Sequence, residues 1–189
     1  MHCPFNNKNC KKKNQKIFLD LGKLPRVDVL LSKQDLKKKE TTKPLKIYFC
    51  KKCFLVQHPV YTDPKDIFVD DYIYYSSTVS SWVEHCQEFV NQSIKRFSLS
   101  QKSFVIEVAS NDGYLLQNFV KKSIPCLGVE PSTGVIKEAK KKGVKTINDF
   151  YNLASSKKII KSYPRADLII ANNVLAHIPN LKDFIESSL

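Results

Sequence analysis

From about residue 103 onward, the chain alternates short apolar runs with segments whose apolar positions recur at helical spacing. The apolar runs predict strands over residues 104–109, 126–130, 144–147 and 166–173. The segments between them predict helices over residues 114–123 and 133–143. The first two runs are almost continuously apolar, which is typical of strands buried on both faces. This alternation predicts an α/β fold with a parallel sheet and right-handed crossovers.

Two segments of different character precede the predicted sheet. Residues 1–62 hold four of the six cysteines and few apolar positions, and we interpret them as a small zinc-binding domain. Residues 63–100 begin at a proline turn, pass through an aromatic stretch and become a helix from Ser81 to about Phe97. The sequence therefore predicts three regions: a zinc-binding domain, an aromatic linker with a helix, and a sheet domain over residues 101–189.

The first predicted strand ends in the tetrapeptide Ser110-Asn111-Asp112-Gly113, after which the chain resumes as a helix. A strand, a tight turn and a helix in this order present a nucleotide-like ligand at the strand ends of an open α/β sheet. Gly113 allows the tight turn, and the helix beyond it offers free N–H groups. The dinucleotide fingerprint has three glycines and this turn has one, so a ligand without a pyrophosphate is favoured.

Carboxylates at the ends of the first two strands indicate what the ligand is. Glu107 lies inside an apolar strand, where a carboxylate is costly unless something pairs with it. We expect it beneath the turn, accepting hydrogen bonds from loop N–H groups or from an ammonium group of the ligand. Glu130 ends the second strand, where a carboxylate can accept both hydroxyls of a ribose. With Asn172-Asn173 ending the fourth strand, the pattern favours an adenosine with a cationic amino-acid tail, S-adenosylmethionine. The alternative is a generic α/β domain with a capped turn and an exposed Glu130.

The order of these motifs resembles that of the sugar C-methyltransferases over nearly the whole chain. The motifs that carry the resemblance are FLDLGKLP, CKKCFLVQ, DYIYYSSTVSSWVEH, VIEVASNDGYLL, GVEPS and ADLIIANNVLAHIPNLKDFI. The resemblance implies a class I methyltransferase core of Rossmann-like topology behind an N-terminal zinc-binding domain. It also implies C-methylation of a nucleotide-linked 4-keto sugar in deoxysugar biosynthesis.

The same resemblance implies site residues. Its cofactor-binding positions map onto Glu107, Ala109, Ser110, Asn111, Asp112, Gly113, Glu130 and Asn172. Ala109 stands where many methyltransferases have glycine. Tyr72, Tyr74 and Ser76 match a motif near the active site, so we expect them on the substrate side. For His177, near the end of the fourth strand, a substrate contact and a packed structural role are equally open.

The N-terminal cysteines predict a structural zinc site. Cys50 and Cys53 are separated by two residues, a spacing that directs two thiolates at one tetrahedral ion. Cys3 and Cys10, separated by six residues, complete the expected set, with His2 and His58 as alternative ligands. A disulfide is disfavoured in a reducing compartment, and unliganded thiols are the other alternative.

Composition narrows the function classes further. The formal net charge is +13, but 28 of the 31 basic residues are Lys, in short scattered runs. Proteins that read base edges or bind phosphates through two parallel hydrogen bonds use mainly Arg, so specific nucleic-acid binding is disfavoured. A basic zinc-ribbon protein that binds nucleic acid is the remaining alternative. The sequence has neither the long apolar stretch of a membrane span nor the apolar core of a signal peptide. A cytoplasmic protein is expected.

The resemblance also predicts an incomplete enzyme, so we assign no catalytic residue. The similar methyltransferases are longer and take their catalytic base from a His- and Glu-containing motif, and no comparable cluster occurs in these 189 residues. We therefore expect a truncated chain, or one half of a split enzyme in which a second polypeptide pairs with the strand at 166–173 and completes the sheet. The alternative is a module that binds zinc and S-adenosylmethionine without catalysis.

Overall fold

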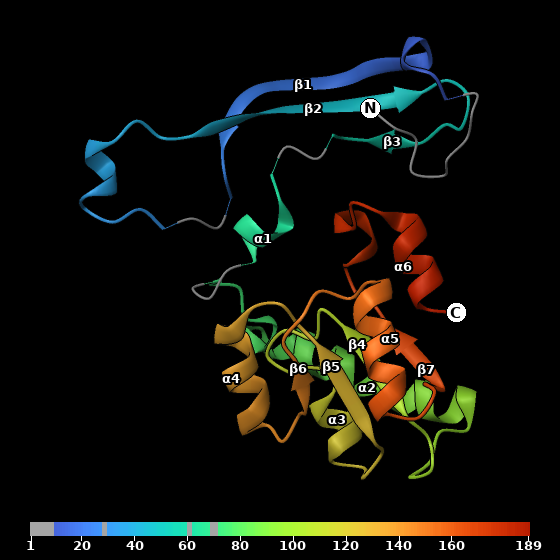
Figure 1. Cartoon of the computed structure of the whole chain (residues 1–189). Coiled ribbons are helices and arrows are strands. Elements are labelled where there is room, and N and C mark those ends of the chain that lie inside the picture. Colours follow the sequence, from blue (N-terminus) through green and yellow to red (C-terminus); the bar gives the residue numbers. More distant parts are fainter. Residues whose placement is uncertain (1–9, 28–29, 60–61, 69–71) are drawn as a thin grey trace. The chain divides into compact units, whose positions relative to one another are not determined.

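The structure, a computed structural model, describes residues 10–27, 30–59, 62–68 and 72–189 (Figure 1). It divides into two compact units, Met1–Asp66 and Ile67–Leu189. The helix predicted from residue 81 lies in the second unit. The boundaries expected at residues 62 and 100 stay a prediction.

The first unit is built on a three-stranded antiparallel sheet in the order β1-β2-β3. Figure 1 shows its two long strands, β1 and β2, running side by side. The elements of this unit are η1 (Lys12–Asn14), β1 (Gln15–Pro25), η2 (Asp35–Lys37), β2 (Thr42–Cys50), β3 (Val56–Gln57) and the start of α1 (Pro64–Ile67). Ten of the eleven β1 residues are exposed, so neither face of this strand is buried and its sequence lacks the alternation that identifies a half-buried strand.

The second unit contains a four-stranded parallel sheet, as the sequence predicted, and its strand order is β6-β5-β4-β7. Its strands are β4 (Val105–Val108), β5 (Cys126–Val129), β6 (Thr146–Ile147) and β7 (Leu168–Ile170). All four residues of β4 are buried, which is what its continuous apolar run predicted. The α/β fold class with a parallel sheet is confirmed.

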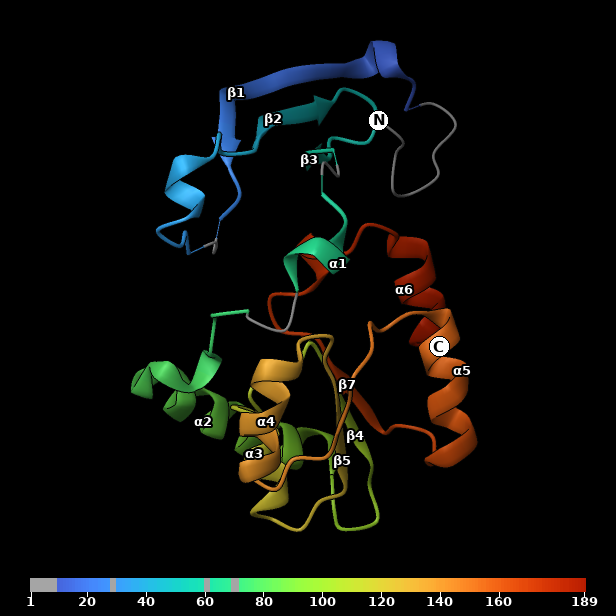
Figure 2. The same cartoon turned by 60° about the vertical axis from the view of Figure 1, so that its left-hand side comes forward.

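Helices cover both faces of this sheet. Figure 2 shows α2, α3 and α4 on one side of the sheet and α5 and α6 on the other. These elements are η3 (Ser76–Thr78), α2 (Ser80–Phe97), α3 (Gln117–Val120), α4 (Thr133–Lys141), α5 (Leu153–Ser162), η4 (Leu175–His177) and α6 (Leu181–Ser187). Successive residues of β4 serve two cores, since Val105 packs with α2 and α3, and Ile106 and Val108 pack with α5 and α6. Cys86 of α2 is buried in the same core as Val105, and burial raises the pKa of its thiol to about 11.

The helix predicted over 114–123 is wrong in its length. Only Gln117–Val120 forms a regular turn of helix. The N–H groups of Asn118 and Phe119 donate to the carbonyls of Leu115 and Leu116, which is the tighter i to i−3 pattern. This geometry accompanies complete burial of two consecutive leucines, Leu115 and Leu116.

In the described part of the chain, no helix combines the length and apolar character needed to cross a membrane.

Candidate functional site

The turn after β4 has an unusual backbone. Ala109, Asn111 and Gly113 all have φ in the left-handed region, at +53°, +50° and +76°. Glycine adopts this region freely and other residues rarely do, so a glycine would suit the position of Ala109. The turn is closed by the N–H of Gly113, which donates to the carbonyl of Ser110 at 3.0 Å.

Ser110 lies against the neighbouring strand and shows why β5 contains a glycine. A Cβ atom on Gly128 would lie 2.3 Å from Ser110 Oγ and 3.1 Å from Thr146 Oγ1. Any larger residue at Gly128 would therefore displace the turn. Gly128 was not among the predicted site residues, although a glycine inside an apolar strand is itself a sign of close backbone approach.

Glu130 ties the turn to the end of β5. Its Oε2 accepts from the backbone N–H of Asn111 at 3.0 Å, and its Oε1 accepts from the N–H of Ser132 at 2.9 Å. The residue is 3 % exposed, which contradicts the alternative of an exposed Glu130. Burial raises the pKa of Glu130 above its ordinary value, although these two N–H groups oppose the shift. Each oxygen has a further lone pair for a ligand hydroxyl.

Glu107 does not accept from the loop N–H groups, which corrects one of the two roles expected for it. The side chain is fully buried, and among the described residues no backbone N–H donates to either carboxylate oxygen. Burial raises the pKa of Glu107 well above its ordinary value; the Tyr114 hydroxyl opposes this shift, and Glu130 and Asp112 add to it. Burial raises the pKa of Tyr114, and the Asn172 side chain lies close enough to its hydroxyl to oppose this shift, so Glu107, Tyr114 and Asn172 lie together at the carboxyl ends of β4 and β7.

The side chains of Asn111 and Asp112 turn to a distant segment of the chain. Asn111 Oδ1 accepts from the N–H of Ser76 at 2.9 Å, and Asn111 Nδ2 donates to the carbonyl of Tyr74 at 3.0 Å. Asp112 Oδ2 accepts from both the N–H and the hydroxyl of Ser77. The structure thus brings the Tyr74–Ser77 segment, expected on the substrate side, onto the turn expected to bind the cofactor.

The residues predicted on the substrate side differ in how far they are exposed. Tyr74 is 55 % exposed, whereas Ser76 is buried. Tyr72 is partly buried and packs edge-on against Phe68, with ring centroids 5.4 Å apart. His177 is exposed in η4, which argues against a packed structural role.

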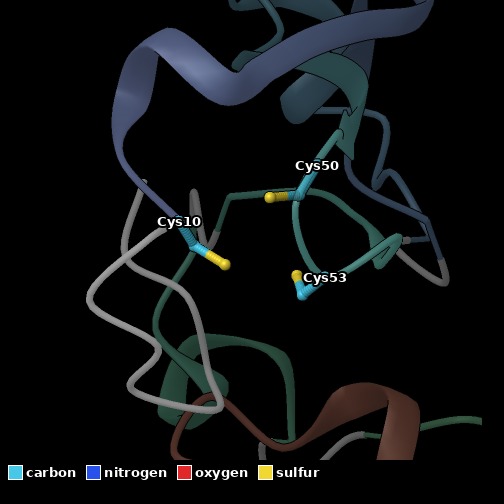
Figure 3. Close-up of side chains that lie close together, drawn as sticks. All are labelled: Cys10, Cys50 and Cys53. Atoms are coloured by element: carbon cyan, nitrogen blue, oxygen red, sulfur yellow. The ribbon is translucent and has the colours of Figure 1, made fainter.

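Three cysteines of the first unit form a candidate metal centre. The Sγ atoms of Cys10, Cys50 and Cys53 all lie within 4.8 Å of one another and point toward a common centre (Figure 3). Thiolates about 2.3 Å from one tetrahedral zinc lie at separations of this order. Cys10 and Cys50 are the buried residues of this unit among those described, so the metal centre occupies the place of its core.

Local backbone structure prepares Cys50 as a ligand. The N–H groups of Cys53 and Lys52 hold the pKa of the Cys50 thiol down to about 7. The knuckle closes where the N–H of Phe54, at φ +59°, donates to the Cys50 carbonyl at 2.8 Å. His58 is exposed and its Nδ1 lies 2.8 Å from the Pro59 carbonyl, and it is not part of the cysteine group. Cys3 and His2, the other predicted ligands, lie outside the described residues.

Comparison with protein families finds two matches in the order predicted. Residues 8–68 match the family described as "Putative zinc binding domain", and residues 82–189 match the family described as "Methyltransferase domain". The chain is also 26% identical over 167 residues to the C-methyltransferase NovU of Streptomyces niveus. The match covers 88% of this chain and 40% of that protein.

These matches bear on the sequence-based predictions. They confirm the resemblance to C-methyltransferases, the zinc-binding and Rossmann-like architecture, and both predicted cofactors, S-adenosylmethionine and zinc. The chain spans about 40% of the length of the curated relative it matches. The assignment of individual residues to the cofactor and the substrate stays a prediction.

Proposed function

We propose that this chain, which belongs to the methyltransferase domain family, is the zinc- and cofactor-binding part of an enzyme that C-methylates a nucleotide-linked 4-keto sugar. The sugar substrate rests on the resemblance of the motifs and on the similarity to a C-methyltransferase. The binding of S-adenosylmethionine at the β4 turn rests on the local structure.

One observation carries the proposed cofactor site. Glu107 is buried at the carboxyl end of a parallel strand, no cationic side chain pairs with it among the described residues, and Glu130 and Asp112 lie near enough to raise its pKa. A group of buried carboxylates of this kind is unfavourable by itself and is relieved by a cation. S-adenosylmethionine carries a sulfonium and an ammonium group, so its charge fits the residues present.

The chain's own residues then have distinct roles in the proposed site. Glu107 faces the ammonium group, and Glu130 offers its remaining lone pairs to the ribose hydroxyls. Ala109, Ser110 and Gly113 supply a turn that lets the ligand approach the backbone closely, and Asn172 orients Tyr114 beside Glu107. S-adenosylmethionine, when bound, supplies an already activated methyl group, so the protein contributes mainly positioning and a base.

The base belongs, in this proposal, to the remaining part of the enzyme, on the same or on a second polypeptide. Among the described residues β7 pairs on one side only, with β4. Its other side borders a groove of about 330 Å³ that is lined by residues of β7 and by Phe89, Ser93, Arg96 and Phe97 of α2. An edge strand with unpaired backbone groups beside a groove suits a further strand.

Calorimetry on the purified chain tests the cofactor site. Glu107→Gln should weaken S-adenosylmethionine binding about tenfold or more, because the variant loses one charge-assisted interaction with the ligand's ammonium. Glu138→Gln removes an exposed carboxylate that pairs with Lys141 and should bind as the wild type does. Equal affinities of all three proteins would contradict the assignment.

Methyl transfer from labelled cofactor to a panel of nucleotide-linked 4-keto sugars tests the sugar substrate. We expect no transfer by this chain alone and transfer when the second part of the enzyme is added. Turnover by a monodisperse monomer of this chain would contradict the split. Cofactor binding without transfer under either condition would favour the second candidate, a non-catalytic module that binds zinc and S-adenosylmethionine.

A further inference from the structure

Residues 72–78, here called the strap, are held to the ligand-binding turn by side chains of that turn. Asn111 binds the backbone of Tyr74 and Ser76, and Asp112 binds the backbone and hydroxyl of Ser77. These contacts join residues 35 to 37 positions apart in the sequence. The two side chains that look most like polar cofactor ligands are therefore engaged by the protein itself.

Lys142, at the end of α4, also contacts both the turn and the strap. It caps the C-terminal end of α4, and its Nζ donates to Asp112 Oδ2 at 2.9 Å, to the Asp112 carbonyl at 2.8 Å and to Ser77 Oγ at 3.0 Å. Asp112 is 1 % exposed, and a buried carboxylate needs a countercharge and hydrogen bonds. Lys142 supplies the charge, so strap, turn and helix α4 are joined at one ammonium group.

The strap is held at its other end by aromatic contacts. Tyr72 packs against Phe68, and Phe68 packs against Phe150, with ring centroids 6.3 Å apart. Phe150 follows β6, whereas Asn111 and Asp112 follow β4. Because β5 lies between β4 and β6 in the sheet, the two attachments lie on either side of the end of β5, where Glu130 is.

We propose that Lys142 and Asp112 are positioning residues that fix the strap across the carboxyl ends of β4, β5 and β6, and that Asp112 is not a cofactor ligand. The fixed strap presents the exposed Tyr74 side chain at the mouth of the site. That this mouth receives S-adenosylmethionine and a sugar rests on the proposed function. The attachment itself does not depend on any ligand.

Hydrogen exchange of the full chain without ligand tests the attachment. In Lys142→Met, the amides of Ser76 and Ser77 should exchange about tenfold faster or more, because charge-assisted hydrogen bonds that hold the strap are lost. Lys141→Met removes a neighbouring exposed lysine and should leave both amides as in the wild type. Lys142→Arg keeps the charge and should restore most of the protection.

Two further measurements separate positioning from a general loss of stability. The amides of β4 and α2 should exchange at the wild-type rate in Lys142→Met, and Ser77→Ala should loosen the strap without removing the buried charge pair. Unchanged exchange at Ser76 and Ser77, or equal acceleration throughout the second unit, would overturn the proposal. Failure to bind S-adenosylmethionine would contradict the proposed function and leave the exchange result to decide the strap.

Discussion

The backbone N–H of Asn111 donates to the carboxylate of Glu130 at 3.0 Å, so the turn after β4 is bound to the end of β5 before any ligand arrives. The residue that the sequence assigns to the ribose therefore also shapes the turn. A preformed site of this kind spends less binding free energy on ordering its own loop. It also means that substitutions at Glu130 change folding and binding together.

Glu130→Gln should lower both stability and affinity. An amide has one acceptor oxygen, so one of the N–H groups of Asn111 and Ser132 loses its partner, at about 1–3 kcal/mol. Denaturant unfolding should show this loss, and calorimetry should show weaker S-adenosylmethionine binding. Glu138→Gln on the exposed face of α4 is the matched control and should change neither quantity. Wild-type stability in Glu130→Gln would show that these hydrogen bonds contribute little.

Glu107→Gln should stabilise the ligand-free protein increasingly as the pH rises. The pKa of Glu107 is raised in the folded state above its reference value of 4.5, so its contribution to stability is present below that value and is lost as the pH rises through the folded pKa. The glutamine stays neutral and avoids this loss. The difference in unfolding free energy between variant and wild type should grow by up to about 1.4 kcal/mol per pH unit.

Thermal or denaturant unfolding between pH 5 and pH 8, in the absence of cofactor, measures this difference. A constant difference across that range would show that Glu107 has the same pKa in the folded and unfolded states. The variant that is more stable at pH 8 is also the one expected to bind S-adenosylmethionine more weakly, because the same unpaired carboxylate disfavours the empty site and attracts the cation.

Gly128→Ala should destabilise the second unit by about 1–3 kcal/mol, since the added Cβ would lie 2.3 Å from Ser110 Oγ. Urea unfolding would measure the loss. The double variant Gly128→Ala with Ser110→Gly removes the clashing side chain and should recover part of the stability. If the double variant were less stable than the sum of the two single changes, the close approach of Ser110 to Gly128 would not be the cause.

Cys53→Ser should release zinc and unfold the first unit. Its described residues bury Cys10 and Cys50 in place of an apolar core, and structural zinc contributes on the order of 10 kcal/mol to small domains. Metal analysis of the purified variant and hydrogen exchange of β2 and β3 would record the loss. Cys86→Ala, in the core of the second unit, should keep the metal. Full zinc content in Cys53→Ser would show that Cys53 is not required to hold the ion.

Much of the second unit could be predicted from local patterns. Nearly continuous apolar runs marked β4 and β5, because strands buried on both faces are made almost entirely of apolar residues. The parallel direction of the strands followed from their alternation with helices. Glu107 and Glu130 stood out because a carboxylate in or at the end of a buried strand needs a partner. The Cys50-x2-Cys53 spacing indicated a metal because one tight knuckle can direct both thiolates at the same ion.

Only the tertiary structure decided which groups those side chains contact. Asn111 and Asp112 read as ligand-binding residues, but their partners are Ser76 and Ser77, and nothing local links segments 35 residues apart. Nothing in the sequence distinguishes Lys142 from the other 27 lysines, whereas in the fold its position at the end of α4 pairs it with the buried carboxylate of Asp112. Hydrophobic periodicity records which face of an element is buried, whereas hydrogen-bond partners depend on where the fold brings distant elements together, and that information is spread over the whole chain.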